Sequence, residues 1–304
     1  MPENQLVSII MNCYNGEKYL REALDSIIDQ TFKNWELIFW DNQSTDNSAN
    51  IVLSYNDHRI KYFYSKTHTL LYEARNLAIE KSEGGYLAFL DVDDYWNSTK
   101  LEKQMLVFSK NSEVAIVYSN YYFKNEIKNT FKEVNKKKLP EGMIVDELLR
   151  KNLMCLLTVL LNRNYINEQE TVFDPRLHIM GDYDMAIKIS SKYKVSCVQQ
   201  PLATYRWHGG NESISHQELC IKEMERWSME MKKSPEISNN KGFQVLLNQI
   251  TYVKAMFLLM KGETLIAFNY CRKLPFGMKK IKLLISFLLP LNIIEHYRTT
   301  IANT

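Results

Sequence analysis

Residues 86–97 read YLAFLDVDDYWN, and this stretch places the first constraint on the fold. The run YLAFL is apolar enough for a strand that is buried on both faces, and it is followed at once by Asp91, Asp93 and Asp94. An ionised carboxylate is costly to bury without a partner, and clustered carboxylates also repel one another. We therefore expect a cation or several strong hydrogen-bond donors beside the end of this strand.

Similar apolar runs lie on both sides of this stretch, and helical patterns separate them. Strands are predicted at residues 6–11, 35–40, 60–65 and 114–120, and helices at 72–82 and 101–108. A further helix is indicated after the first strand, because apolar residues recur there at helical spacing: Leu20, Ala23, Leu24, Ile27 and Ile28. Strands and helices that alternate through short connections predict an α/β fold, with a mostly parallel sheet flanked by helices.

Polar clusters follow three of the predicted strands. NCYN begins at residue 12, DNQSTD at residue 41 and DVDD at residue 91. In open α/β sheets, ligands bind beyond the carboxyl ends of the strands. The residues near 12, 42 and 92 are therefore expected to meet at one rim of the sheet.

Composition and charge exclude several classes of protein. The 304 residues carry a net charge of only +3, which gives no argument for a nucleic-acid partner. Five cysteines without a CxxC pair indicate a reducing compartment. The N-terminal flank MPENQ lacks the basic residues of a signal peptide, and the apolar segment 283–294 is too short to span a bilayer. We expect a cytoplasmic protein that does not cross the membrane, with peripheral contact to the inner membrane face as an open alternative.

The second half of the chain has a different character. Residues 121–142 are basic and polar, which favours a solvated loop or hairpin; the alternative is that the run 136–138 contacts an anionic acceptor or a lipid headgroup. From about residue 216 the pattern is one of long helices. The tail 272–304 mixes Lys and Arg with Leu, Ile and Phe, and two interpretations remain: a helix packed on the main domain, or a basic amphipathic segment on a membrane surface.

The aspartates at the strand end match the needs of a hard cation. Successive strand residues point to opposite faces, so Asp91 and Asp93 share a side while Val92 turns into the core. Mg²⁺ or Mn²⁺ held by one or two carboxylates usually takes its remaining oxygens from phosphate and water, which favours a diphosphate substrate. The alternative is that these residues only cap the following helix.

The joint pattern of these motifs resembles the family 2 glycosyltransferases. The resemblance is strong over about residues 6–120 and weaker over 173–213. It rests on residues 7–48 (VSIIMNCYNGEKYL through QTFKNWEL to DNQSTDNS) and on EARNLAIEKSEGGYLAFLDVDD. It implies a GT-A fold, a nucleotide-diphosphate sugar donor, a divalent cation (Mn²⁺ or Mg²⁺) at a DXD motif, and inversion at the anomeric carbon.

The resemblance assigns a nucleotide site to the first two polar clusters. Asn12 and Tyr14 match positions that pack the donor base, and Arg75 a position from which a basic side chain approaches the nucleotide. Asn42 stands where the family commonly has an aspartate that accepts a hydrogen bond from uracil. An asparagine carbonyl can accept the same bond without charge assistance, so the base stays open, with a UDP-sugar as the favoured donor.

The third cluster receives the diphosphate and the metal. Asp91 matches a position near the ribose, and Val92 is assigned with it to the nucleotide-sugar site. Asp93 matches the metal-binding carboxylate, and His208 in YRWHGG matches a position that meets the metal or the diphosphate. Arg206 is a further candidate for phosphate contact, and Trp96 is a candidate wall for the sugar.

Inversion requires a general base that takes the proton of the acceptor hydroxyl. Asp182 resembles the acidic residue that the family places at the start of a helix beneath the acceptor. A carboxylate at a helix N-terminus is stabilised in its charged form, so we expect Asp182 to be ionised at neutral pH. Asp184 is the rival candidate, but it points about 200° away on the same helix. The alternative for Asp182 is a helix N-cap without catalytic function.

These assignments predict a glycosyltransferase domain over 1–215, with the donor site in about 1–120 and the acceptor site in about 121–215, and a helical region over 216–304. The expected reaction transfers a sugar to a glycan or lipid-linked hydroxyl acceptor in bacterial surface-glycan synthesis. Two alternatives are a non-catalytic sugar-nucleotide-binding module and a sugar nucleotidyltransferase. A nucleotidyltransferase would need a Gly- and Lys-rich phosphate loop, whereas NCYNGEKYL has a single glycine.

Overall fold

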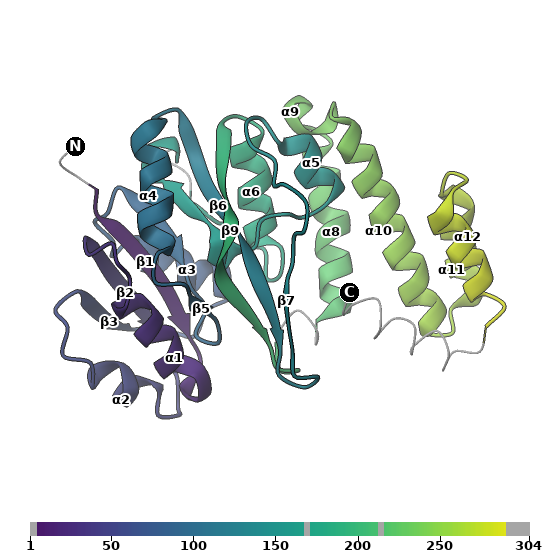
Figure 1. The fold of residues 1–304 in the computed structure, drawn as a ribbon. Coiled ribbons are helices and arrows are strands. Elements are labelled where there is room, and N and C mark those ends of the chain that lie inside the picture. Colours follow the sequence, from purple (N-terminus) through teal and green to yellow (C-terminus); the bar gives the residue numbers. More distant parts are fainter. Residues whose placement is uncertain (1–4, 167–170, 212–215, 290–304) are drawn as a thin grey trace. The chain divides into compact units, whose positions relative to one another are not determined.

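The computed structural model describes residues 5–166, 171–211 and 216–289. The chain divides into two compact units, Met1–Ser215 and His216–Thr304. The predicted α/β class is confirmed in the first unit, where helices flank a central sheet (Figure 1). Each unit is described by itself.

One mixed sheet forms the centre of the first unit. Its strands lie in the order β3-β2-β1-β4-β8-β6-β9-β5, with β7 paired to β6. Their bounds are β1 Val7–Cys13, β2 Trp35–Asp41, β3 Ile60–Tyr64, β4 Tyr86–Phe89, β5 Tyr95–Trp96, β6 Val114–Asn125, β7 Thr130–Glu133, β8 Leu160–Asn162 and β9 Lys194–Trp207.

The parallel part of the sheet consists of the first four strands. β1 pairs in parallel with β2 and with β4, and β2 pairs in parallel with β3. Every residue of β2 is buried, as expected of a strand covered on both faces. Because the strands are parallel and in register, β1 and β2 end side by side, with Cys13 opposite Asp41. The polar residues that follow these strands therefore share one rim.

The second part of the sheet is partly antiparallel. β8 runs antiparallel to both β4 and β6, while β9 is parallel to β6. β9 continues to Trp207, beyond the strand predicted over 195–200, because its second half pairs with β6 as far as Asn125. In the basic segment 121–142, β6 and β7 form the antiparallel hairpin that the sequence left as one option.

Helices cover the sheet, and α1 and α4 lie in front of it in Figure 1. The predicted stripe of α1 packs into one apolar cluster with α2, α4 and alternate residues of β1, among them Val7, Ile9 and Met11. The helices of this unit are α1 Glu17–Ile28, α2 Ser48–Leu53, α3 Leu71–Ile79, α4 Lys100–Lys110, α5 Val145–Arg150 and α6 Gly181–Ser190, with single 3₁₀ turns at Leu156–Thr158 and Arg163–Tyr165.

The second unit is helical in its described part, 216–289. Its helices are α8 Gln217–Met231, α9 Pro235–Ser238, α10 Lys241–Met260, α11 Thr264–Lys273 and α12 Met278–Ser286. A turn at Gly262, which has a left-handed φ of 80°, joins α10 to α11 as the predicted hairpin. Apolar residues of α10, α11 and α12 share one core, including Leu259, Cys271 and Leu283.

Within the described residues, α10 is the one helix that is long and apolar enough to cross a membrane. Length and composition alone do not separate such a span from the core helix of a water-soluble unit. The part of the predicted tail at 290–304 lies outside the described residues.

Candidate functional site

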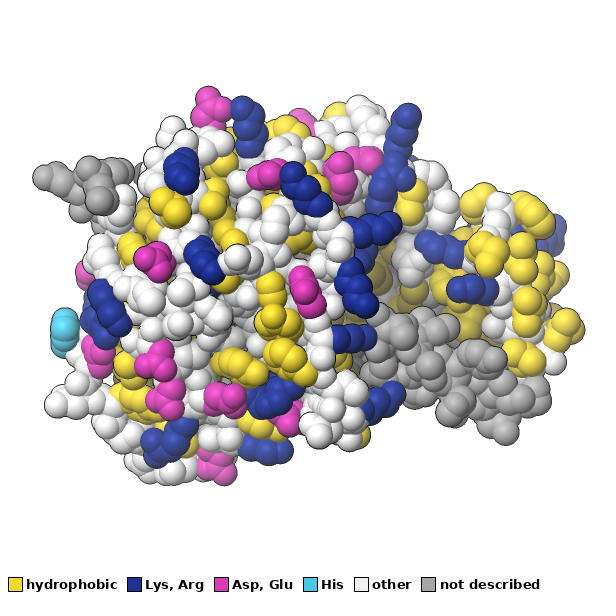
Figure 2. Space-filling model, in the orientation of Figure 1, with side chains coloured by type: hydrophobic (Ala, Val, Ile, Leu, Met, Phe, Trp, Pro, Cys, Tyr) yellow, Lys and Arg dark blue, Asp and Glu magenta, His cyan; other side chains and the backbone are white. Residues whose placement is uncertain are grey.

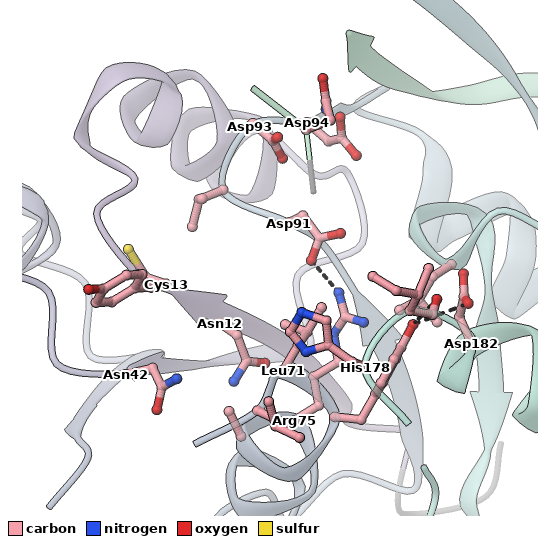
Figure 3. Close-up of a pocket in the computed structure, with 18 of the residues that line it drawn as sticks. Asn12, Cys13, Asn42, Leu71, Arg75, Asp91, Asp93, Asp94, His178 and Asp182 are labelled. Carbon is pink, nitrogen blue, oxygen red and sulfur yellow. Dashed lines mark hydrogen bonds and ion pairs between the residues drawn. The ribbon is translucent and has the colours of Figure 1, made fainter. Parts of the chain in front are cut away.

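A pocket of about 390 Å³ opens at the rim where the parallel strands end. All three polar clusters named above contribute to its lining, through Asn12 near the end of β1, Asn42 after β2 and Asp91 after β4. The predicted convergence of these clusters is therefore confirmed. In the view of Figure 3, Asn12 and Asn42 lie on one side of the pocket and Asp182 on the other.

Asn12 presents an unsatisfied amide to this pocket. Its amide nitrogen and oxygen are both buried, and neither has a hydrogen-bond partner among residues 5–166, 171–211 and 216–289. Buried polar groups are nearly always hydrogen-bonded, so an unpaired amide at a pocket wall fits a polar ligand. Tyr14 is exposed beside it, and its ring meets the ring of His68 edge-on at 4.5 Å between centroids. The two rings give this end of the pocket an aromatic border.

Asn42 is engaged by the chain itself. Its amide nitrogen donates to the carbonyl oxygen of Thr69 at 2.8 Å, and its amide oxygen lies 3.2 Å from the backbone nitrogen of Thr69. His68 Nδ1 lies 2.8 Å from the backbone oxygen of Asn42. These bonds tie the segment before α3 to the end of β2, so Asn42 shapes the pocket wall through that segment.

Arg75 and Asp91 form an ion pair at the wall of the pocket. Arg75 extends from α3, is buried, and places Nη2 2.5 Å from Oδ1 of Asp91 (dashed in Figure 3). Asp91 keeps nearly half of its side chain accessible. The cation that the aspartate cluster needs is thus supplied for Asp91 by this arginine. Val92 lines the pocket and also packs partly against the apolar core, as expected for the residue between the two aspartates.

The other two aspartates of the cluster have different partners. Oδ2 of Asp93 lies 3.0 Å from Nε2 of His208, and Oδ1 of Asp94 accepts a 2.7 Å hydrogen bond from the backbone nitrogen of Arg206. Burial raises the pKa of Asp93 and raises that of Asp94 well above its usual value, and the neighbouring carboxylates add to both shifts. The partners that these two carboxylates find are therefore His208 and the backbone of Arg206, at the end of β9 and just after it.

Arg206 hydrogen-bonds the segment that carries Asp93 and Asp94, and it does not line the pocket. Its Nε donates to the backbone oxygen of Asp93 at 2.8 Å, and its guanidinium pairs with Glu22 and Glu126. Since these partners occupy the guanidinium, the expected phosphate contact from Arg206 is not supported. Trp96 is buried and its indole nitrogen donates to the carbonyl of Leu157, so its expected role as a sugar wall is wrong.

Asp182 lies in the pocket as the second residue of α6, after the N-cap Met180. Its Oδ1 accepts from the backbone nitrogen of Tyr183 at 2.8 Å and lies 3.2 Å from the phenol oxygen of Tyr72. Within the described part of the chain, no group bonds to Oδ2. The rival Asp184 is buried and paired with Lys188 at 2.8 Å, and it does not line the pocket.

The pKa of Asp182 is shifted in the direction opposite to the effect of a helix N-terminus. Burial raises its pKa, although the nearby Arg75, the amide of Tyr183 and the phenol of Tyr72 each act to lower it. The helix N-terminus was expected to keep this carboxylate at a low pKa. Desolvation by the segments around it outweighs that effect, which leaves a carboxylate more basic than an exposed one.

Sequence reasoning missed Tyr72, His68 and His178 as pocket residues. For Tyr72 a signal was present, because it lies three residues before Arg75 on the same helix and therefore on the same face. The segment from 66 to 70 gave no periodic signal. His178 lies in an irregular segment, and only the tertiary structure brings it to the pocket (Figure 3).

Residues 8–169 match the model of Glycosyl transferase family 2. Two similar proteins from Escherichia coli are the UDP-Glc:alpha-D-GlcNAc-diphosphoundecaprenol beta-1,3-glucosyltransferases WfgD and WfaP. WfgD is 32% identical over 74% of this chain and 84% of its own length, and WfaP is 31% identical over 69% and 81%.

Two solved structures share the fold at lower sequence identity. S. aureus TarS 1-349 in complex with UDP-GlcNAc has a TM-score of 0.65 and 19% identity, over 88% of this chain and 81% of that one. The mannosyltransferase PcManGT from Pyrobaculum calidifontis, in complex with GDP-Man and Mn2+, has a TM-score of 0.65 and 14% identity, over 96% and 82%.

Proposed function

The chain belongs to glycosyl transferase family 2 and has a GT-A fold, and from this premise we propose an inverting sugar transfer from a nucleotide-diphosphate sugar to a hydroxyl acceptor. The observation that carries this proposal is the pocket itself. It combines the unpaired amide of Asn12 with a carboxylate, Asp182, whose Oδ2 has no partner among the described residues. One group can hold a polar ligand and the other can accept a proton.

We assign the donor nucleotide to the side of the pocket formed by Asn12, Tyr14 and Asn42. The aromatic border of Tyr14 and His68 suits a flat base, and the Asn12 amide offers it a donor and an acceptor. Relatives favour UDP, since the name of WfgD specifies UDP-Glc and TarS was solved with UDP-GlcNAc. PcManGT was solved with GDP-Man, so the base is part of the proposal.

In the transfer step, Oδ2 of Asp182 takes the proton of the acceptor hydroxyl. The acceptor oxygen forms its bond to the anomeric carbon while the bond from that carbon to the diphosphate oxygen breaks. The nucleoside diphosphate leaves with the bonding electrons, and the anomeric configuration inverts. Because burial raises the pKa of Asp182, this carboxylate is a stronger base than an exposed aspartate.

Asp93 and His208 would hold a divalent cation. The residues fit such an ion, because a carboxylate oxygen and an imidazole nitrogen are both accepted ligands and lie 3.0 Å apart. Within the described residues there is no cluster of three or more His, Cys, Asp or Glu ligands, so the other oxygens would come from diphosphate and water. When bound, the cation would stabilise negative charge on the leaving diphosphate.

The acceptor is proposed to be a lipid-linked glycan in bacterial surface-glycan synthesis. This proposal is supported by the similarity to WfgD, whose name gives alpha-D-GlcNAc-diphosphoundecaprenol as its acceptor. In this proposal residues 1–120 hold the donor, residues 121–215 hold the acceptor, and the protein works in the cytoplasm with peripheral contact to the membrane. Asp182 lies in the acceptor part, as its proposed function requires.

Transfer by Asp182→Asn, compared with wild type and with Asp184→Asn, tests the catalytic assignment. The assay follows radiolabelled sugar from a panel of UDP- and GDP-sugars into a synthetic GlcNAc-diphosphate-lipid acceptor. Loss of the base lowers kcat by roughly 10²–10⁴-fold in Asp182→Asn, while Asp184→Asn keeps most of its activity. Transfer at the wild-type rate by Asp182→Asn would reject Asp182 as the base. If wild type transfers none of the sugars, the non-catalytic binding module is favoured.

A thermal-shift panel of nucleoside diphosphates, with and without Mn²⁺, tests the donor site independently of transfer. A nucleotide that binds the native state raises the apparent Tm by mass action. We expect one nucleotide to stabilise wild type in the presence of Mn²⁺ and Asp93→Ala to lose the metal-dependent part. No shift with any nucleotide would reject this pocket as the donor site.

A further inference from the structure

Helix α12 and the turn after it carry apolar residues on two sides, and among the described residues only one side packs into a core. Leu283 is buried in the core of the second unit, and Phe287 packs against the same core. Met278 and Ile285 lie on a different side of the helix, Leu288 lies in the turn after it, and all three are exposed. An amphipathic helix of a soluble unit normally presents charged and polar residues to water on that side.

The neighbouring helix α11 and its loop extend this apolar surface. Leu265 and Phe268 of α11 are exposed, whereas Ala267 and Cys271 of the same helix are buried. The ring of Phe268 also meets the ring of Phe287, at 5.7 Å between centroids. Phe276, in the loop between α11 and α12, is the most exposed large apolar side chain of the described residues, at 86%; Leu265 and Leu288 follow at 83% and 84%. Exposed apolar residues that gather on one part of a surface usually mark an interaction site.

Positive charge surrounds these residues. Between 264 and 289 the sequence has no Asp or Glu and five cations, Arg272, Lys273, Lys279, Lys280 and Lys282. The whole chain, in contrast, is nearly balanced, with 38 Lys and Arg against 35 Asp and Glu. Figure 2 shows hydrophobic and Lys/Arg side chains together on the part of the surface that α11 and α12 form.

We propose that this α11–α12 surface, defined by Leu265, Phe268, Phe276, Met278, Ile285 and Leu288 with the five cations named above, docks the protein on an anionic lipid bilayer. The apolar side chains enter the boundary between headgroups and acyl chains, and the cations pair with lipid phosphates. The positive charge of this surface favours an anionic bilayer over a second copy of the chain as its binding partner. A two-fold contact through this surface would bring the same cations together, with no carboxylate between 264 and 289 to neutralise them.

The proposal does not depend on the sugar donor or on the catalytic residues, and vesicle binding tests it directly. The full chain is floated with vesicles of phosphatidylcholine alone and with vesicles that contain about a third phosphatidylglycerol. We expect binding to the anionic vesicles, weak binding to the neutral ones, and loss of binding as salt screens the cations. Equal binding to both vesicle types, or to neither, would overturn the proposal.

Two variants separate the apolar and the ionic contributions. Leu265→Ser with Phe276→Ser removes two exposed apolar side chains, and Arg272→Gln with Lys273→Gln and Lys282→Gln removes three cations. Each cation near an anionic surface contributes about fivefold to binding, so the second variant should bind on the order of a hundredfold more weakly. The first variant should lose binding to both vesicle types, because its loss is not electrostatic.

A matched control is the exposed lysine run 136–138 of the first unit, changed to Gln at all three positions. It removes the same charge as the cation variant, and it should keep its vesicle binding. If this control loses binding while the α11–α12 variants keep it, the membrane contacts the other lysine run and the proposal is wrong. Melting temperatures establish that all variants are folded, since exposed substitutions change stability little.

Light scattering after gel filtration tests the second copy as occupant. The wild type and the Leu265→Ser, Phe276→Ser variant should have the same mass in solution. A wild-type dimer that the variant converts to a monomer, without any change in vesicle binding, would assign the surface to self-association and overturn the proposal.

Discussion

The phenol oxygen of Tyr72 lies 3.2 Å from Oδ1 of Asp182, although 110 residues separate them in the chain. The same oxygen lies 3.1 Å from the backbone oxygen of Ile179, just before α6. Burial raises the pKa of Tyr72 well above its usual value, so the phenol stays protonated and remains a donor. Tyr72 therefore fixes one oxygen of Asp182 and leaves the other for an incoming hydroxyl.

Tyr72→Phe should shift the acid limb of the rate profile to higher pH. The phenol hydrogen bond lowers the pKa of Asp182 against the rise caused by burial, so its removal raises that pKa further. A base works only when deprotonated, and activity is therefore lost at a higher pH in the variant, by roughly one pH unit. The measurement is kcat against pH at saturating donor. An unchanged acid limb would mean that the titrating base is not Asp182.

Gly181→Ala should destabilise the protein and disturb the same contact. A Cβ at Gly181 would lie 2.6 Å from three ring carbons of Tyr72, and this ring is buried and has little room to move. Overpacking of this kind costs about 1–3 kcal/mol, and kcat should fall with it. Gly277→Ala is the control, because nothing lies within 4 Å of its added Cβ. Urea denaturation measures both, and equal stability of the two variants would contradict the packing argument.

Arg75→Met should raise the donor KM as well as the pKa of Asp182. It removes the partner of Asp91 at the pocket wall, and it removes a positive charge that lowers the pKa of Asp182. Tyr72→Phe, in contrast, should change kcat and leave the donor KM unaltered. Arg59→Met serves as the control, since Arg59 pairs with Asp57 and does not line the pocket. Donor titrations at two pH values distinguish these outcomes, and a normal KM in Arg75→Met would remove Arg75 from the donor site.

Lys100→Met should stabilise the protein, most strongly below pH 7. Lys100 is fully buried, with Nζ bonded to Gln104 and placed 4.1 Å from the ring centroid of Trp96, and burial lowers its pKa from 10.5 to about 7. Below pH 7 the folded protein must bury the charged ammonium group, which lowers the free energy of unfolding. Between pH 7 and 10.5 the lysine is neutral in the folded protein and still protonated in the unfolded chain, so this destabilisation becomes smaller as the pH rises.

The shift in the pKa of Lys100 corresponds to a penalty on the order of a few kcal/mol at acidic pH. Wild type should therefore have a higher urea midpoint at pH 9 than at pH 6, and this difference should be smaller in Lys100→Met. Lys110→Met, exposed at the other end of the same helix, should leave the wild-type difference in place. If the two variants have the same pH dependence of stability, Lys100 is not the group responsible.

Most of the parallel sheet could be predicted because its signals are local. Apolar runs such as residues 6–11 and 35–40 are typical of strands buried on both faces, and the helices predicted between the strands favour parallel pairing. Parallel strands end at one rim, and this alone brought Asn12, Asn42 and Asp91 together. Two features could not be predicted: the antiparallel pairing of β8 with β4 and β6, and the full length of β9. Both depend on strand partners that are distant in sequence.

The sequence by itself determined that Asn12, Asn42 and the aspartates after residue 90 meet at one rim. Only the tertiary structure decided how each aspartate behaves: Asp91 meets Arg75, Asp93 meets His208, and Asp182 is buried beside Tyr72. It also decided which apolar residues of α11 and α12 face water. The physical reason is that side-chain type and spacing are local properties. Desolvation, hydrogen-bond partners and exposure depend on segments that come together only when the chain folds.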